Sequence, residues 1–294
     1  MPKLYVVATP IGNLNDLSPR MREALSRADM IAAEDTRVTM KLLNHFDIKK
    51  PMTSCHRHNE EDKAPRIVER MIAEDLTVAL TCDAGTPGIS DPGHLLVRAC
   101  HEAGIPVEPV CGPSAVATAL SVSGFDAKEF AFYGFLPREK KALSEKLDAI
   151  RAAGVPVFVL YESPHRVLDL VSAIAEKWPE SLLCVCSDLT KRYERLYRGG
   201  ADAVRRQLSE NANIEKGEYC VVVDLSALPP VEKAEQRPRA EVWMLSRLLD
   251  GASLSEAAAD AQAAGYARNE VYRAKLRISE LFEDEPMSED EPKN

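Results

Sequence analysis

No uninterrupted apolar segment in this 294-residue chain is long enough to cross a membrane, which disfavours an integral membrane protein. The N-terminal residues have neither the apolar core of a signal peptide nor a transit-peptide composition. The seven cysteines include no CxxC pair and lie mostly within apolar runs, so we expect a cytoplasmic protein with reduced core thiols. Cys55, His56 and His58 lie close together in the sequence, but no second ligand pair accompanies them, and we predict no metal site.

Two nucleotide-binding fingerprints, GxGxxG and GxxxxGK[ST], are also absent. Their absence disfavours a Rossmann dehydrogenase, a common Rossmann-type methyltransferase and a P-loop enzyme. The net charge of -9 argues against a chain covered in nucleic-acid-binding surface. Residues 283–294, EDEPMSEDEPKN, carry much of this negative charge and predict a disordered acidic tail. Local basic patches elsewhere therefore remain credible.

Short β-type runs alternate with helical patterns along the chain. The first four cover residues 4–8, 30–33, 77–81 and 107–111, and a second alternation begins with residues 157–161, 182–186 and 219–223. The order of the first four runs is typical of a mostly parallel, helix-covered sheet, and the two alternations together predict two α/β domains. We expect an N-terminal α/β domain at 1–124, an aromatic and glycine-rich crossing at 125–137, and a C-terminal α/β domain at 138–228.

A small helical appendage is predicted at residues 229–282. Ser253 and Glu256 have the spacing of a capping box, and Gly265 has the position of a helix stop. The apolar stripe of a last helix follows at Val271, Ala274, Ile278 and Leu281. A helix-turn-helix-like contact with nucleic acid and a helical cap packed on the second domain both fit, the cap being the commoner arrangement.

The stretch LTCDAGTPGISDPG, residues 80–93, predicts a ligand-binding loop after a strand. Its glycines let the backbone approach a ligand, its prolines stiffen the loop, and its aspartates accept hydrogen bonds. A loop from Thr9 leads to a helix capped by Ser18, and Ser114 stands at another helix start, where a simple N-cap role would also justify it. Open α/β sheets bind ligands where such loops converge.

Seven motifs in order resemble one family: TPIGNLNDLS, AEDTR, DAGTPGISDPG, GPSA, GFLPR, YESPHR and DLTK. They are similar to the ribosomal RNA small subunit methyltransferase I family of the tetrapyrrole-methylase-like superfamily, the class III S-adenosylmethionine methyltransferases. The resemblance runs from about Lys3 to Asp224 and continues weakly into GYARNEVY. It implies two α/β domains with S-adenosylmethionine in the cleft between them and a homodimer. It also implies methylation of the ribose 2′-hydroxyl of a decoding-centre cytidine in 16S rRNA within the small ribosomal subunit.

The resemblance also implies which residues hold the cofactor, mainly through backbone groups. They are Pro10, Ile11, Gly12, Asp83, Ala84, Gly85, Thr86, Ile89, Ser114, Ala115, Tyr161 and Leu189. A sulfonium with an adenine needs oxygen atoms near its positive sulfur and an apolar slot for the ring, which these loops can supply.

A ribose hydroxyl is a poor nucleophile, so catalysis must align the reacting atoms and help to remove the proton. The candidate bases are Glu34, Asp35 and His165. We favour Asp35, hydrogen-bonded or charge-paired near Arg37, although a carboxylate of ordinary pKa is a weak base for an alcohol.

Basic segments are the predicted RNA contacts. KRYERLYR joins cations to tyrosines, which suits phosphate pairing and base stacking, although its alternation equally fits a solvated edge strand. The predicted RNA-binding residues are Arg37, Arg138, Lys140, Lys141, Arg166, Lys191, Arg192 and Arg195.

The sequence departs from the family pattern at Cys82, at Ser187 with Asp188, and at Leu143. Cys82 replaces a nearly isosteric serine, whereas the other departures remove positive charge from the expected RNA face. Two alternatives therefore stay open. One is a small-molecule methylase of the same superfamily with a tetrapyrrole-like substrate, and the other is a non-catalytic RNA-binding or ribosome-assembly factor.

Overall fold

A computed structural model describes residues 1–229 and 238–283 of the chain. The chain forms two compact units, residues 1–231 and residues 232–294. The first unit contains both β-sheets, and the second contains only helices among its described residues. The predicted acidic tail falls, apart from Glu283, outside the described residues.

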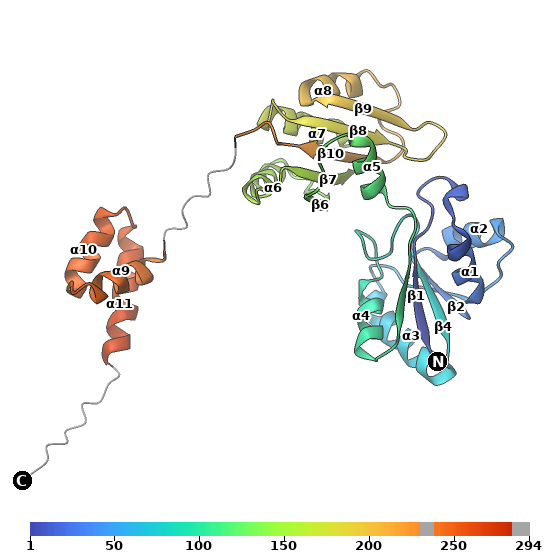
Figure 1. Cartoon of the computed structure of the whole chain (residues 1–294), viewed down its shortest axis with the longest axis horizontal. Helices are drawn as coiled ribbons and strands as arrows, with labels where there is room; N and C mark the ends of the chain where they lie inside the picture. Colours follow the sequence, from blue (N-terminus) through green and yellow to red (C-terminus); the bar gives the residue numbers. More distant parts are fainter. Residues whose placement is uncertain (230–237, 284–294) are drawn as a thin grey trace, which may run out of the picture. The chain divides into compact units, whose positions relative to one another are not determined.

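The first sheet has five strands in the order β3-β2-β4-β1-β5, all parallel. The strands are β1 (Lys3–Val7), β2 (Met30–Ala33), β3 (Met52–Ser54), β4 (Thr77–Thr81) and β5 (Val107–Val110). The helices that cover it are α1 (Pro19–Arg27), α2 (Thr36–His45), α3 (Glu60–Glu74) and α4 (His94–Glu102), with a 3₁₀ turn, η1, at Leu14–Asp16. Helices α1 and α2 lie on one side of the sheet, and α3 and α4 lie on the other (Figure 1). Alternate residues of the strands enter two separate cores beneath these pairs of helices.

The second sheet has the order β6-β7-β10-β8-β9 and is mixed. Its strands are β6 (Phe130–Phe135), β7 (Val157–Glu162), β8 (Leu182–Ser187), β9 (Arg195–Gly200) and β10 (Tyr219–Asp224). Only the β6–β7 pair is parallel among its neighbours, because β10 and β9 run against β7 and β8. The predicted parallel arrangement holds for the first sheet, from whose strands it was inferred, and the second sheet is mixed.

One face of the second sheet packs on α6 (Lys140–Ala152), α7 (Val167–Lys177) and α8 (Ala201–Ser209). The opposite face packs on α5 (Ala115–Ser123), which follows β5 in the chain but lies against β8 and β10 (Figure 1). Val116 and Leu120 of α5 contact the same apolar cluster as Val159 and Val222 of the sheet. Helix α5 therefore ties the carboxyl edge of the first sheet to the face of the second.

The seven predicted strands are all present, with ends that differ by at most a residue from the predicted ones. The predicted cap at Ser18 is present, because its hydroxyl accepts a hydrogen bond from the backbone N–H of Met21. Ser114 caps α5 in the same way through Ala117. Strands β3, β6 and β9 were not among the predicted runs, and β6 lies where only a crossing between domains was expected.

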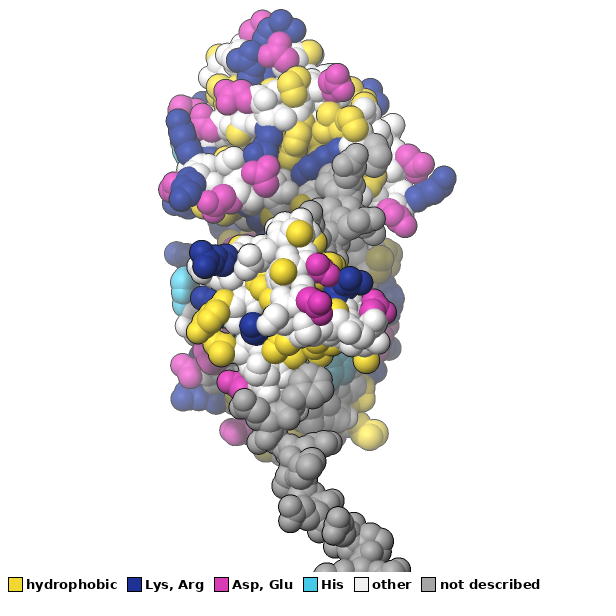
Figure 2. Space-filling view, turned by 90° about the vertical axis from the view of Figure 1, so that its left-hand side faces the viewer, with side chains coloured by type: hydrophobic (Ala, Val, Ile, Leu, Met, Phe, Trp, Pro, Cys, Tyr) yellow, Lys and Arg dark blue, Asp and Glu magenta, His cyan; other side chains and the backbone are white. Residues whose placement is uncertain are grey.

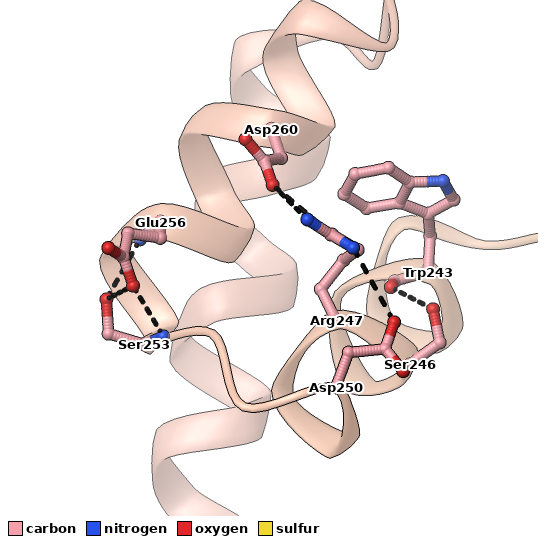
Figure 3. A network of polar contacts seen from close by, with 7 residues as sticks. All are labelled: Trp243, Ser246, Arg247, Asp250, Ser253, Glu256 and Asp260. Carbon is pink, nitrogen blue, oxygen red and sulfur yellow. Dashed lines mark hydrogen bonds and ion pairs between the residues drawn. The ribbon is translucent and has the colours of Figure 1, made fainter.

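The helical unit consists of α9 (Ala240–Leu249), α10 (Leu254–Ala263) and α11 (Arg268–Glu283) around its own small core. The predicted capping box is present: Glu256 N–H donates to the Ser253 hydroxyl, and Ser253 N–H donates to the Glu256 carboxylate (Figure 3). Arg247 of α9 pairs with Asp260 of α10 at 3.0 Å, which joins the two helices (Figure 3). Gly265 has a φ of +89°, in accord with the predicted helix stop.

The predicted apolar stripe of the last helix is correct at Val271, Ala274 and Ile278, which are buried. It is wrong at Leu281, which is 68% exposed because it lies beyond the last turn that packs on α9 and α10. On the face shown in Figure 2, the described cations and carboxylates are interspersed rather than segregated. None of the described helices is both long and apolar enough to cross a membrane.

Candidate functional site

A cavity of about 370 Å³ lies within the first unit, between loops of the two sheets. Its volume falls in the range of small-molecule sites. Nine of the residues predicted to hold a cofactor line it: Ile11, Ala84, Gly85, Thr86, Ile89, Ser114, Ala115, Tyr161 and Leu189. They come from the loops after β1, β4 and β5, the start of α5, strand β7 and the loop after β8. Loops far apart in the sequence therefore form one pocket.

Backbone hydrogen bonds hold these loops together. Thr9 and Gly85 exchange two backbone bonds, at 2.8 and 3.0 Å, which joins the loop after β1 to the loop after β4. The Thr86 hydroxyl donates to the carbonyl of Pro113 at 3.4 Å, which links the same loop to the one after β5. Gly85 has a φ of +83°, a conformation that L side chains rarely adopt. These bonds fix the three loops that line the cavity on the side of the first sheet.

Three residues predicted to bind the cofactor, Pro10, Gly12 and Asp83, do not line the cavity. Pro10 is buried directly before Ile11. A Cβ on Gly12 would lie 3.0 Å from the Leu189 carbonyl oxygen, so this glycine lets the loop after β1 pass close to the loop after β8. Gly12 therefore supports the wall without facing the cavity.

Asp83 belongs to a group of carboxylates at the ends of β2 and β4. Its backbone N–H donates to the Glu34 carboxylate at 3.2 Å, and its own carboxylate accepts from the backbone N–H of Asp35 at 3.1 Å. Partial burial raises the pKa of both Glu34 and Asp83 above the ordinary value. The structure thus brings the predicted acids together, beside the cavity rather than in it.

Asp35 caps helix α2 and pairs with Arg37, as predicted. The Arg37 guanidinium lies 2.6 Å from one carboxylate oxygen of Asp35, and the Arg37 backbone N–H lies 2.8 Å from the other. These hydrogen bonds lower the pKa of Asp35 to about 2. Asp35 is therefore a weaker base than an ordinary carboxylate.

Asp91 is a carboxylate that lines the cavity and was missed among the predicted site residues. Burial, with a smaller contribution from the nearby carboxylates of Glu34 and Asp83, raises its pKa to about 6, and the guanidinium of Arg57 opposes this shift. Asp91 is thus poised to exchange a proton near neutral pH. Its burial cannot be read from the sequence, where it appears only as one of two aspartates in a loop.

The loop that carries Asp91 is anchored from the start of α3. The buried Glu60 carboxylate accepts from the backbone N–H groups of Gly93 and Leu95 at 2.9 and 2.8 Å, and so satisfies the first turn of α4. Arg57 donates to the carbonyl of Ser90 at 2.9 Å. Both anchors were missed, because their partners are more than thirty residues away in the sequence.

The family described as Tetrapyrrole (Corrin/Porphyrin) Methylases matches residues 3–204. "Ribosomal RNA small subunit methyltransferase I" of Haemophilus influenzae is 40% identical over 275 residues, which cover 93% of this chain and 96% of that protein. The protein of the same name from Xylella fastidiosa is 44% identical over 225 residues, or 76% of this chain and 82% of its own. This chain belongs to the ribosomal RNA small subunit methyltransferase I family.

Solved structures share its fold. The methyltransferase CobJ superposes with a TM-score of 0.57 at 17% identity, covering 79% of this chain and 98% of its own. Uroporphyrin-III C-methyltransferase from Thermus thermophilus, solved with S-adenosyl homocysteine, gives 0.53 at 15% identity and covers 76% and 97%. The predicted family and fold class are confirmed, and with them the methyltransferase class and its cofactor, S-adenosylmethionine.

His165, the third residue predicted as a general base, is exposed and does not line the cavity. The next residue, Arg166, was predicted to bind RNA. In the structure it donates to the carbonyl of Leu136 at 3.0 Å and pairs with the buried carboxylate of Glu162, so three quarters of its side chain is covered. Within the fold, Arg166 acts as a tie between β6, β7 and α7.

The other residues predicted to contact RNA differ in their exposure and in their ion pairs. Arg138, Lys140 and Lys141 are exposed at the start of α6, and Arg192 is exposed over the ring of Tyr193. Lys191 is half-buried and pairs with Asp188 and Glu218 at 3.0 and 2.9 Å. Arg195 begins β9, an edge strand, which bears out the edge-strand interpretation of this segment in part.

The departures from the family pattern have local explanations. Cys82 is buried with its thiol against the carbonyls of Ala84 and Gly85, and burial raises its pKa to about 12. Asp188 neutralises Lys191, as its position beside that cation requires. Leu143 packs partly buried against the core of the second sheet, so its place in the fold is structural. Among the described residues, no group of three or more His, Cys, Asp or Glu side chains is arranged to hold a metal ion.

Proposed function

We propose that this protein transfers a methyl group from S-adenosylmethionine to the ribose 2′-hydroxyl of a decoding-centre cytidine in 16S rRNA. The observation that carries the proposal is the match, over 93% of the chain, to a protein named for methylation of small-subunit ribosomal RNA. The small ribosomal subunit as the substrate, a homodimer and a cytoplasmic location belong to the same proposal.

The cavity suits this cofactor. Backbone at Gly85 and Ala84 offers polar groups, whereas Ile11, Ile89 and Leu189 offer an apolar wall for a ring. The bound cofactor supplies an electrophilic methyl group on a sulfonium. The residues of this chain hold that group in place, exclude water from the apolar wall and accept the proton of the attacking hydroxyl.

Asp91 is the proton acceptor that the geometry favours. It lines the cavity, and its pKa of about 6 leaves it mostly ionised at neutral pH while still basic enough to share a proton in the transition state. Asp35 lies outside the cavity and is held as a cap by Arg37, which supports a role in shaping the end of β2. Alignment of the hydroxyl contributes alongside proton removal.

The RNA contacts in this proposal are the exposed cations at the start of α6 and on the β8–β9 turn. Arg138, Lys140 and Lys141 offer a basic cluster, and Arg192 stands beside an exposed tyrosine. Arg37, with 86% of its side chain exposed, adds a cation beside the carboxylates at the ends of β2 and β4. Such contacts to phosphate make binding salt-dependent.

Methyl-labelled S-adenosylmethionine, incubated with unmodified small subunits, naked 16S rRNA and a tetrapyrrole precursor, tests the proposal. Label transferred to RNA is the expected result, and the two RNA arms show which assembly state is recognised. Label on the tetrapyrrole alone would favour a small-molecule methylase. Absence of cofactor binding would favour a non-catalytic RNA-binding factor. Sedimentation of the purified protein tests the dimer.

A further inference from the structure

Phe135 is a large apolar side chain left open to solvent at the cavity. It is 61% exposed, although it lines the cavity and its neighbour Leu136 is buried. A phenylalanine so exposed forfeits much of the free energy that burial of its ring would contribute. Its position beside a cavity is therefore a reason to look for a ligand that would cover it.

A β-bulge directs Phe135 toward the cavity. Phe132 is the partner of Val159, and Gly134 is the partner of Leu160, so Tyr133 is an extra residue in β6. Strict alternation would place Phe135 on the same face as Tyr133, which packs against the core on the other side of the sheet. The bulge places it instead beside Tyr161, which lines the cavity.

Gly134 makes this arrangement possible. Its φ is +61°, in the left-handed region, and a Cβ at this position would lie 3.3 Å from the Ser90 hydroxyl. Ser90 belongs to the loop that Arg57 and Glu60 anchor and that carries Asp91. The exposed ring and the candidate proton acceptor thus line the same cavity, and the strand of one passes close to the loop of the other.

The ring of Phe135 also has a firm support. Its centroid lies 5.8 Å from that of Tyr161 at an interplanar angle of 63°, and Phe132 contacts Tyr161 in the same edge-on way at 4.9 Å. Edge contacts on one side leave a ring face available on the other. Exposed aromatic faces are the surfaces on which proteins stack unpaired nucleobases.

We propose that Phe135 is a stacking platform for the base of the target nucleotide, which it holds so that the attached ribose faces the cavity. This inference rests on the proposed function, because it takes an unpaired pyrimidine nucleotide of RNA as the occupant. A base removed from its stack needs such a surface to replace the contacts it loses.

The test compares Phe135→Ala and Phe135→Trp with the parent and with Phe130→Ala. Phe130 is the matched control, since it lies on the same strand, is 47% exposed and does not line the cavity. Three quantities are measured: the dissociation constant of S-adenosylmethionine, the KM and kcat for small subunits, and the quenching of a fluorescent cytosine analogue placed at the target position of a short RNA.

Phe135→Ala is expected to raise the KM for RNA by about 5- to 150-fold, the range that corresponds to one stacked base, and to abolish the quenching. Cofactor affinity should change less than twofold. Phe135→Trp should keep the quenching, and Phe130→Ala should behave as the parent.

If Phe135→Ala weakened cofactor binding as much as it raised the KM for RNA, the proposal would be overturned, because the ring would then belong to the cofactor site. Unchanged quenching in Phe135→Ala would overturn it too. Quenching by the parent without methyl transfer would support the platform while contradicting the proposed function. Transfer by the parent without quenching would support the function and contradict the platform.

Discussion

Asp35 and Asp91 show how surroundings divide the roles of identical side chains. Hydrogen bonds from the exposed Arg37 hold the pKa of Asp35 at about 2, whereas burial beside other acids raises the pKa of Asp91 to about 6. The sequence favoured Asp35, because AEDTR places it visibly beside an arginine. Burial, which decides the basicity of Asp91, depends on loops brought together only by the fold.

Asp91→Asn is expected to lower kcat by about 100-fold or more, the contribution of a positioned base. A base must be deprotonated to act, so the parent's rate should rise about tenfold per pH unit below pH 6 and level off above it. In a pH profile of single-turnover rates, the variant should lose this rise of the rate below pH 6. Asp35→Asn is the control, because a pKa of about 2 lies below the assay range. If the rate of Asp91→Asn still rose in this way below pH 6, Asp91 would not be the base.

Gly12→Ala is expected to weaken cofactor binding without unfolding the chain. The added methyl group would lie 2.5 Å from Lys191 Cγ and 3.0 Å from the Leu189 carbonyl oxygen, so it would push the wall that Leu189 forms. Calorimetry should show a dissociation constant for S-adenosylmethionine raised by about fivefold or more. Gly200→Ala, where nothing lies within 4 Å, is the control. An unchanged affinity of Gly12→Ala for S-adenosylmethionine would show that the loop can move to accommodate the methyl group without disturbing the cofactor site.

At the scale of elements, inner strands were predictable and irregular or polar ones were not. Residues 77–81 form a short apolar run because β4 is covered on both faces by helices. Strand β6 was missed because its bulge at Tyr133 and Gly134 breaks the alternation that marks a strand. Strand β9 was ambiguous because an edge strand exposes residues such as Arg195 and Leu196 to water.

The cofactor loops were predictable only in part. Loops rich in glycine and proline, such as residues 83–89, can be recognised in the sequence by these residues. Anchors such as Arg57 and Glu60 cannot, because charged residues around the start of a helix are typical of an ordinary solvated surface. Phe135 was likewise missed, since only the bulge turns it toward the cavity.

Glu60→Ala tests the anchoring of α4 and of the loop before it. The change leaves three backbone N–H groups, those of Gly93, Leu95 and Leu96, without their acceptor. The free energy of unfolding should fall by about 2 to 4 kcal/mol in urea titrations. Glu61→Ala, one residue along and exposed, should leave stability within about 0.5 kcal/mol. Equal stability of the two variants would contradict the anchoring role.

At the scale of the whole molecule, the cavity belongs to the first unit alone. Its lining runs from Ile11 to Cys220, and the helical unit has a separate core around Met244 and Val271. The cofactor site is thus completed by loops of two sheets, and helix α5 joins one sheet to the other. No described residue of the helical unit contributes to the cavity.

A chain that ends at Val231 should therefore bind S-adenosylmethionine within about twofold of the full chain. Isothermal titration calorimetry on both proteins measures this directly, and circular dichroism checks that the shorter chain is folded. A loss of cofactor affinity beyond tenfold in a folded shorter chain would show that the helical unit supports the cavity.

The position of the methyl group on RNA tests the proposed 2′-O-methylation most closely. Labelled RNA from small subunits treated with the protein is digested with alkali, which cleaves only next to a free 2′-hydroxyl. The expected product is a single labelled, alkali-resistant dinucleotide that contains cytidine and maps to the decoding region. Label released as mononucleotides would place the methyl group on a base, and resistant label elsewhere would place it on another nucleotide. Either result would rule out 2′-O-methylation of a decoding-centre cytidine.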